Sequence, residues 1–198
     1  MSAIMLFSCA GIGNSPPTYK NDLCNIFLEK KEWYKSTRTA SIKWGIPIPV
    51  IMAIMYQESS FVADAKPERT TCLFIFPGPR PTSAYGYPQA LNETWDNYIK
   101  NTQSYGADRD DFHDACDFIG WYCDLSYKKC GIKKYDAYHL YLAYHEGHKG
   151  FLAKTYRNKS WLIKVAQKVK QRSVLYESQL NQCEHMFIKK RSCCLWPF

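Results

Sequence analysis

Several features that mark other protein classes are missing from this chain of 198 residues. No apolar run reaches the ~18 residues that a membrane-spanning helix needs, so the sequence predicts no such helix. A phosphate-binding glycine loop and a serine nucleophile elbow are also absent, which argues against a P-loop nucleotide hydrolase and an α/β-hydrolase. Strand-like alternation is confined to residues 73–76, and there is no internal repeat. The sequence therefore predicts one mainly α domain with appendages.

The composition favours a globular protein with an anionic partner. Hydrophobic residues make up 46% of the chain, enough for a sizeable core, and the net charge is +8. A basic surface suits peptidoglycan, nucleic acid or anionic lipid, so the charge alone does not choose among them. The aromatic content of 16% adds rings that stack on sugars or bases when they lie in a groove, although most are expected in the core.

Nine cysteines indicate an oxidising compartment. Cys9 stands apart, because it follows Leu6-Phe7-Ser8 in a pattern that resembles a bacterial lipobox, whose cysteine is lipidated. The preceding segment is short and lacks the positive charge of a signal peptide. Without Cys9, eight cysteines are left for disulfides, and their pairing cannot be read from the sequence: 24, 72, 116, 123, 130, 183, 193 and 194.

Helical periodicity organises most of the chain. It predicts six helical segments: 19–34, 50–61, 88–98, 108–125, 135–144 and 160–187, the last with an interruption near Arg172. Residues 62–82 carry four prolines and form a long irregular loop. We expect residues 1–17 to be a signal remnant and tether, 18–151 a catalytic domain, and 152–198 a helical, cysteine-rich extension packed on it.

The segment from Ile46 to Phe61 is an apolar run that ends near one carboxylate. In a helix, Ile51, Ile54 and Glu58 share a face, so the carboxylate continues an apolar stripe. Loss of hydration would raise the pKa of Glu58 toward that of a general acid. The alternative is a carboxylate at a fraying helix end that reaches solvent.

Three short motifs follow one another in a family order: 57–61 (QESSF), 83–90 (SAYGYPQA) and 143–147 (AYHEG). Together they resemble the soluble lytic transglycosylase family, which is related to goose-type lysozyme, over Ile46 to Phe151. The chain departs from the family pattern at His145, where asparagine is usual, and at Tyr87-Pro88, where Leu-Met is common.

The resemblance implies a lysozyme-like domain that cleaves the β-1,4 bond between N-acetylmuramic acid and N-acetylglucosamine. It implies that Glu58 is both the acid and the base, that Tyr144 orients it, and that the product ends in a 1,6-anhydro ring. No cofactor or metal is implied, and the protein would be lipid-anchored through Cys9 to the outer membrane, in a bacterial periplasm. The resemblance also implies a set of substrate contacts: Ser59, Ser83, Gly86, Tyr87, Gln89 and His145.

Other interpretations stay open. A second carboxylate across the cleft, at Asp64, Asp117 or Glu146, would make hydrolysis like that of a lysozyme available. The protein could instead bind peptidoglycan without cleaving it, and Tyr144 could be an ordinary core residue.

Two rival sites are weaker. The candidate ligands of a metal site are His139, His145, His148, Cys116, Cys123 and Cys130. The spacing of these cysteines is unusual for structural zinc, and disulfides explain the cysteines better. The basic residues 189–191 and the lysine-rich last helix could bind nucleic acid or anionic lipid, but a solvated helix face is more common. We therefore expect no nucleic-acid partner.

Overall fold

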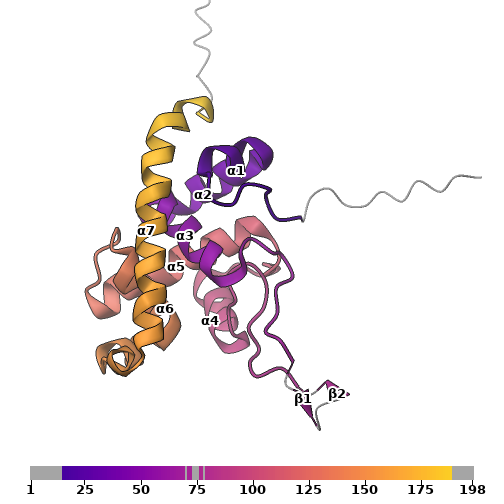
Figure 1. Ribbon diagram of the computed structural model, residues 1–198, viewed down its shortest axis with the longest axis vertical. Helices are drawn as coiled ribbons and strands as arrows, with labels where there is room; N and C mark the ends of the chain where they lie inside the picture. The colour runs from indigo at the N-terminus through magenta and orange to yellow at the C-terminus, as the bar shows by residue number, and fades with distance from the viewer. Residues whose placement is uncertain (1–14, 70, 73–75, 78, 189–198) are drawn as a thin grey trace, which may run out of the picture.

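The computed structural model describes residues 15–69, 71–72, 76–77 and 79–188, and the protein is mainly α, as predicted (Figure 1). Strands β1 (Thr71–Cys72) and β2 (Phe76–Pro77) pair antiparallel, with Cys72 opposite Phe76. Cys9, the predicted lipidation site, and residues 189–191 lie outside the described residues. The elements, in chain order, are α1 (Leu23–Glu29), α2 (Lys31–Trp44), α3 (Ile48–Ser59), β1 (Thr71–Cys72), β2 (Phe76–Pro77), α4 (Asn92–Thr102), α5 (Phe112–Cys130), α6 (Ala137–Leu152), η1 (Thr155–Asn158), α7 (Ser160–Cys183) and η2 (Glu184–Met186).

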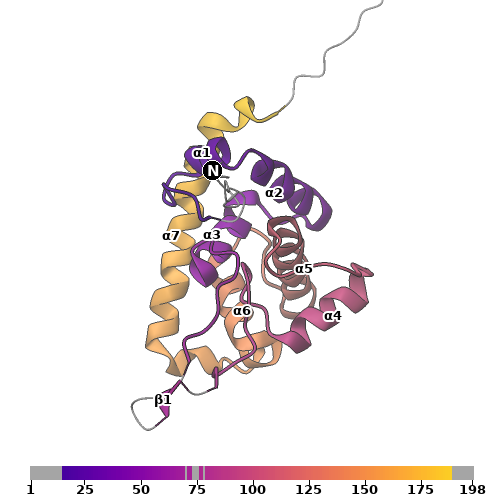
Figure 2. The same ribbon diagram turned by 90° about the vertical axis from the view of Figure 1, so that its right-hand side faces the viewer.

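Helix α3 is the centre of the fold (Figure 2). It contacts α2, α5, α6 and α7, and its residues from Ile48 to Met55 are all buried. A helix that is apolar all round can be stable in water only when it is enclosed in this way. Pro49 lies in its first turn, where a missing N–H costs nothing, and Ser60 ends it in a left-handed conformation. Glu58 therefore sits at the end of the most enclosed helix of the protein.

Helix α7 runs along one side of the molecule and packs against α3, α6 and α1 (Figures 1 and 2). Its buried residues recur every three or four positions and include Leu162, Ala166 and Val169. The predicted interruption near Arg172 is absent, and the helix continues to Cys183. The Arg172 guanidinium instead stacks over the Tyr56 ring of α3, 3.4 Å from its centroid.

The cysteines form fewer disulfides in the described residues than the sequence led us to expect. Cys24 of α1 is bonded to Cys183 at the end of α7. Cys116, Cys123 and Cys130 are free thiols on α5. Neighbours among these three are seven residues apart, roughly 10 Å along the helix, which is too far for a disulfide. The prediction that disulfides explain Cys116 and Cys123 was therefore wrong, and both thiols belong to the core.

Within the described ranges, no single helix is long and apolar enough to cross a membrane. Helices α2 and α3, which are bent by 115° relative to each other, are long and apolar enough when they are taken together, by length and composition alone.

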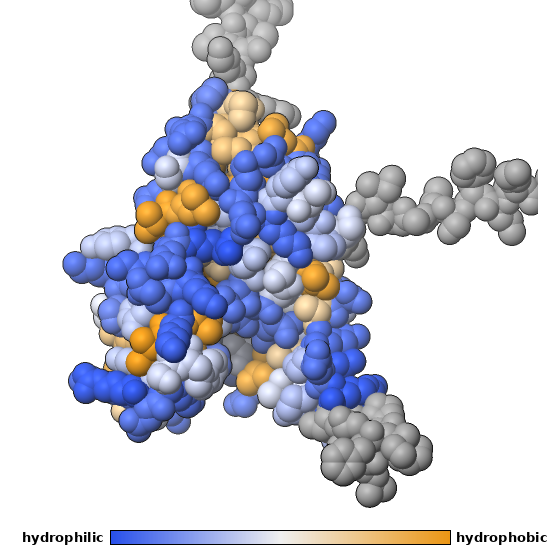
Figure 3. Space-filling model, in the orientation of Figure 1, coloured by the Kyte–Doolittle hydropathy of each residue, from blue (hydrophilic) through white to orange (hydrophobic). Residues whose placement is uncertain are grey.

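The surface in Figure 3 is mostly polar, with scattered apolar patches. It is hollowed toward the lower end of the view, beside the part of the surface that holds α6 and the start of α7.

Candidate active site

Glu58 opens into a cleft of about 530 Å³. One wall comes from the chain between Thr82 and Thr94, the floor from α5, and the opposite wall from α6. All three motifs of the sequence contribute to it. The residues that line the cleft are Glu58, Thr82, Ala84, Gln89, Ala90, Leu91, Thr94, Phe118, Tyr122, Tyr144, His145, Glu146 and Gly147. A slightly larger groove of about 570 Å³ lies between α1, α2 and η2, but none of the motif residues lines it.

The surroundings of Glu58 are mostly apolar and aromatic. Its side chain is half-buried, with Phe118, Tyr122 and Tyr144 among the residues that line the same cleft. Burial raises the pKa of Glu58 to about 7, while a hydrogen bond with Tyr141 acts in the opposite direction. Near neutral pH the carboxyl group is therefore divided between its protonated and ionised forms, as a group that must give and take a proton requires.

Tyr141, not Tyr144, makes the hydrogen bond to Glu58. The sequence predicted that Tyr144 would orient the acid. Instead the Tyr144 hydroxyl donates to the backbone carbonyl of Pro88, at 2.7 Å, while its ring lines the cleft. The two tyrosines are three residues apart on α6, so they share a face, and α6 contacts α3.

The turn at residues 83–90 is fixed by a close backbone approach at Gly86 and by hydrogen bonds from the Gln89 side chain. Gly86 has φ +77°, and a Cβ atom there would lie 2.1 Å from the Arg109 carbonyl oxygen. The Gln89 side-chain amide donates to the carbonyls of Ala65 and Gly86, both at 2.8 Å. Gly86 and Gln89 therefore shape this wall of the cleft, and Gln89 also lines it.

Three predicted substrate contacts lie elsewhere. Ser59 is buried and its hydroxyl donates to the Met55 carbonyl of its own helix, at 3.2 Å. Tyr87 is 2% exposed and packs edge-on against Trp33 and Phe112 in the core. Ser83 is exposed, and its hydroxyl accepts the backbone N–H of Asn92 at the start of α4. None of the three is among the residues that line the cleft, and neither is Gly86, so Gln89 and His145 are the predicted contacts that do line it.

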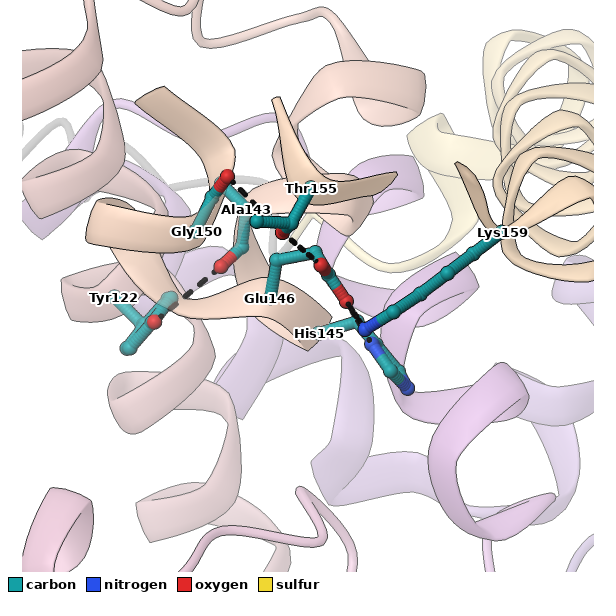
Figure 4. Close-up of polar contacts among 7 residues, drawn as sticks. All are labelled: Tyr122, Ala143, His145, Glu146, Gly150, Thr155 and Lys159. Carbon is teal, nitrogen blue, oxygen red and sulfur yellow. Dashed lines mark hydrogen bonds and ion pairs between the residues drawn. The ribbon is translucent and has the colours of Figure 1, made fainter. Parts of the chain in front are cut away.

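Glu146 is the second carboxylate among the described residues of the cleft wall, and it is fully engaged (Figure 4). It accepts a hydrogen bond from the Lys159 ammonium at 2.7 Å and another from the Thr155 hydroxyl. Its Oε1 also lies 3.1 Å from Nδ1 of His145. These partners outweigh the effect of its burial and lower the pKa of Glu146 to about 2.

The other two candidate carboxylates do not line the cleft. Asp117 is buried, where it pairs with Lys43 and accepts hydrogen bonds from Trp44 and Tyr98, all at 2.8 Å. Asp64 is exposed in the loop after α3.

The residues of the rival metal site are dispersed. His139 bonds to Asp136, His145 to Glu146, and His148 to the Ser126 hydroxyl. Within the described part of the chain, no group of three or more potential ligands among His, Cys, Asp and Glu is arranged to hold a metal ion.

A family model described as a transglycosylase SLT domain matches residues 1–183. The chain belongs to this family. No curated protein and no solved structure matches it. The match extends on both sides of Ile46 to Phe151, so the SLT domain includes α1, α2 and the whole of α7. Membership in this family suggests lytic transglycosylase activity on peptidoglycan.

Sequence reasoning missed several cleft residues of the SLT domain. Phe118 and Tyr122 come from α5, and Leu91 and Thr94 come from the start of α4. No motif marks them. Tyr141 lies on the same face of α6 as Tyr144, and only the contact between α6 and α3 reveals that this face is directed at Glu58.

Proposed function

We propose that this SLT domain cleaves the β-1,4 bond between N-acetylmuramic acid and N-acetylglucosamine by lytic transglycosylation, with Glu58 as the only acid and base. The observation that carries the proposal is the contrast between the two carboxyl groups of the cleft. The pKa of Glu58 is raised to about 7, whereas that of Glu146 is lowered to about 2. Of these two carboxyl groups, Glu58 is the one that exchanges a proton near neutral pH.

In the first step the protonated Glu58 gives its proton to the glycosidic oxygen. The bond between that oxygen and C1 of the muramoyl sugar breaks, and the N-acetylglucosamine side leaves as an alcohol. The positive charge on C1 is stabilised by the N-acetyl oxygen of the muramoyl sugar itself. In the second step the Glu58 carboxylate takes the proton from the 6-hydroxyl, whose oxygen bonds to C1. No water is consumed, and Glu58 ends protonated, as it began.

The environment of Glu146 supports this mechanism over hydrolysis. A hydrolase with two carboxylates needs a nucleophile or a second base opposite the acid. Glu146 is held by Lys159 and Thr155, and such an engaged, weakly basic carboxylate is a poor base for water. The substrate's own 6-hydroxyl is then the nucleophile that Glu58 activates.

Product analysis tests the proposal. Purified sacculi are digested with the protein, and the released muropeptides are analysed by mass spectrometry. Anhydro-muramoyl ends, one water lighter than reducing ends, are expected. Reducing ends would identify a hydrolase, and intact sacculi would identify a non-catalytic binder.

The matched variants are Glu58→Gln and Glu177→Gln. Glu177 is an exposed carboxylate on α7, outside the residues that line the cleft. Glu58→Gln is expected to abolish cleavage with an unchanged circular-dichroism spectrum, and Glu177→Gln to retain full activity. Cleavage at the normal rate by Glu58→Gln would remove this residue from the chemistry.

We also propose that the protein works in a bacterial periplasm, anchored through a lipid on Cys9. The disulfide between Cys24 and Cys183 supports an oxidising compartment. Growth in labelled palmitate tests the anchor: label is expected in the protein and absent from Cys9→Ser.

A further inference from the structure

Trp161 is an exposed aromatic side chain at the edge of the cleft. It lies in the first turn of α7 and is 53% exposed. Its indole packs edge-on against the imidazole of His145, with ring centroids 5.1 Å apart, and His145 lines the cleft. A large ring left in water beside a binding cleft offers a flat apolar face to a sugar ring.

The neighbouring imidazole is held in a fixed position (Figure 4). Nδ1 of His145 lies 3.1 Å from Oε1 of Glu146, which Lys159 and Thr155 hold in turn. Because Glu146 is ionised, Nδ1 must be the donor in this contact. In the neutral imidazole the other nitrogen, Nε2, is then an acceptor, ready for a sugar hydroxyl or an N-acetyl N–H.

The hydrogen-bonded group around His145 and the neighbouring Trp161 come from two helices. His145 and Glu146 belong to α6, while Lys159 and Trp161 lie at the start of α7. The ion pair between Glu146 and Lys159 therefore fixes Trp161 relative to the cleft. A stacking face and a hydrogen-bond acceptor, held side by side, are what recognition of a single sugar ring requires.

We propose that Trp161 and His145 form an additional saccharide subsite that extends the cleft at its α6–α7 end. Trp161 stacks on the apolar face of a sugar ring and His145 accepts a hydrogen bond from it. The inference rests on the proposed function for the identity of the substrate, a glycan of alternating N-acetylglucosamine and N-acetylmuramic acid. The role of this subsite is to favour long glycan strands over short fragments.

The test measures binding with the chemistry switched off. In the Glu58→Gln background, the dissociation constant for an octasaccharide of the alternating glycan is measured by calorimetry. Trp161→Ala is expected to weaken binding about 3- to 10-fold, and Trp161→Phe to restore most of the loss. Tyr105→Ala is the matched control, because Tyr105 is 78% exposed and does not line the cleft.

A kinetic measurement separates this role from a structural one. In the active protein, Trp161→Ala is expected to raise KM for long strands with kcat unchanged, because the subsite binds ground state and transition state alike. Octasaccharide affinity within twofold of the parent in Trp161→Ala overturns the subsite, and so does failure of the Glu58→Gln protein to bind the octasaccharide at all. If the wild type releases no muropeptides but its affinity still depends on Trp161, the subsite stands and the proposed function falls.

Discussion

The Tyr141 hydroxyl is hydrogen-bonded to the carboxyl group of Glu58, across the contact between α6 and α3. Burial raises the pKa of the acid and this hydrogen bond lowers it, and the balance leaves the value at about 7. Tyr141 is itself 4% exposed, so its hydroxyl has little access to water and is positioned for Glu58. It is a positioning residue, whose effect should appear in the pH dependence of cleavage.

Tyr141→Phe should move the alkaline limb of the pH–rate profile to higher pH. Without the hydrogen bond, the ionised form of Glu58 loses a donor, so the pKa of Glu58 rises from its value of about 7. The maximal rate should fall about 10-fold, because the same bond stabilises the carboxylate that forms after proton transfer. The measurement is initial rate against pH on soluble glycan strands.

The matched control is Tyr144→Phe, which removes a hydroxyl that donates to Pro88 instead of Glu58. It should leave the midpoint of the alkaline limb in place. An equal displacement in both variants would show that the two hydroxyls act on Glu58 alike, contrary to the geometry.

Glu58→Gln should stabilise the protein, and only above about pH 4.5. Below the unfolded-state pKa of Glu58, both states carry the proton and the charge has no effect on folding. Between pH 4.5 and about 7 the unfolded chain ionises first, so stability of the wild type falls as pH rises. Above pH 7 the loss is constant, on the order of 3 kcal/mol, because the pKa values of Glu58 in the folded and unfolded states differ by about 2.5.

Thermal unfolding between pH 4 and pH 8 measures this difference. The Tm of Glu58→Gln should match that of the wild type at pH 4 and exceed it by several degrees at pH 8. A Tm difference that does not change with pH would mean that Glu58 is well hydrated in the folded state.

Gly86→Ala should be strongly destabilising. The residue has φ +77°, and its new Cβ would lie 2.1 Å from the Arg109 carbonyl oxygen, a backbone atom that cannot move aside cheaply. We expect a loss of roughly 3 kcal/mol or more, with activity falling as the turn that holds Gln89 deforms.

Gly131→Ala separates strain from collision. Gly131 has a similar φ of +68°, but a Cβ there meets nothing within 4 Å. Its substitution should cost only about 1 kcal/mol, the penalty of the left-handed conformation. Equal losses in the two variants, measured by urea unfolding, would contradict the close approach at Gly86.

The sequence was most informative where one residue type leaves little choice. The apolar stripe before Glu58 predicted a carboxylate with a raised pKa, because Ile51, Ile54 and Glu58 share a face in a helix; the structure adds that the residues from Ile48 to Met55 are all buried. The helix at 19–34, in contrast, is two helices, α1 and α2, which meet at Lys30 and continue to Trp44. When the apolar residues of two consecutive amphipathic helices keep the same spacing, the break between the helices hardly changes the hydrophobic periodicity of the sequence.

The roles of particular polar groups could not be predicted, because they depend on which helices meet. Tyr141 and Tyr144 share one stripe, and the sequence gives no reason to prefer either as the partner of Glu58. Glu146 is a candidate second carboxylate by its place in the third motif, but Lys159, thirteen residues later, pairs with it. Tyr87 lies in a motif that suggests ligand binding, yet its ring is enclosed by Trp33 and Phe112.

Loss of the disulfide between Cys24 and Cys183 should destabilise the whole domain. It joins α1 to the end of α7 across 159 residues, so its loss frees a long segment of the unfolded chain. A cost of about 2–5 kcal/mol is expected for the double variant Cys24→Ser, Cys183→Ser. Addition of dithiothreitol to the wild type should lower the Tm to that of the variant, and the variant itself should be insensitive.

Because α7 packs on α3, whose last turn carries Glu58, the half-life of activity at elevated temperature should shorten in parallel with the Tm. A wild-type Tm unaffected by full reduction would show that packing of α7 alone, without the covalent link, supports the acid.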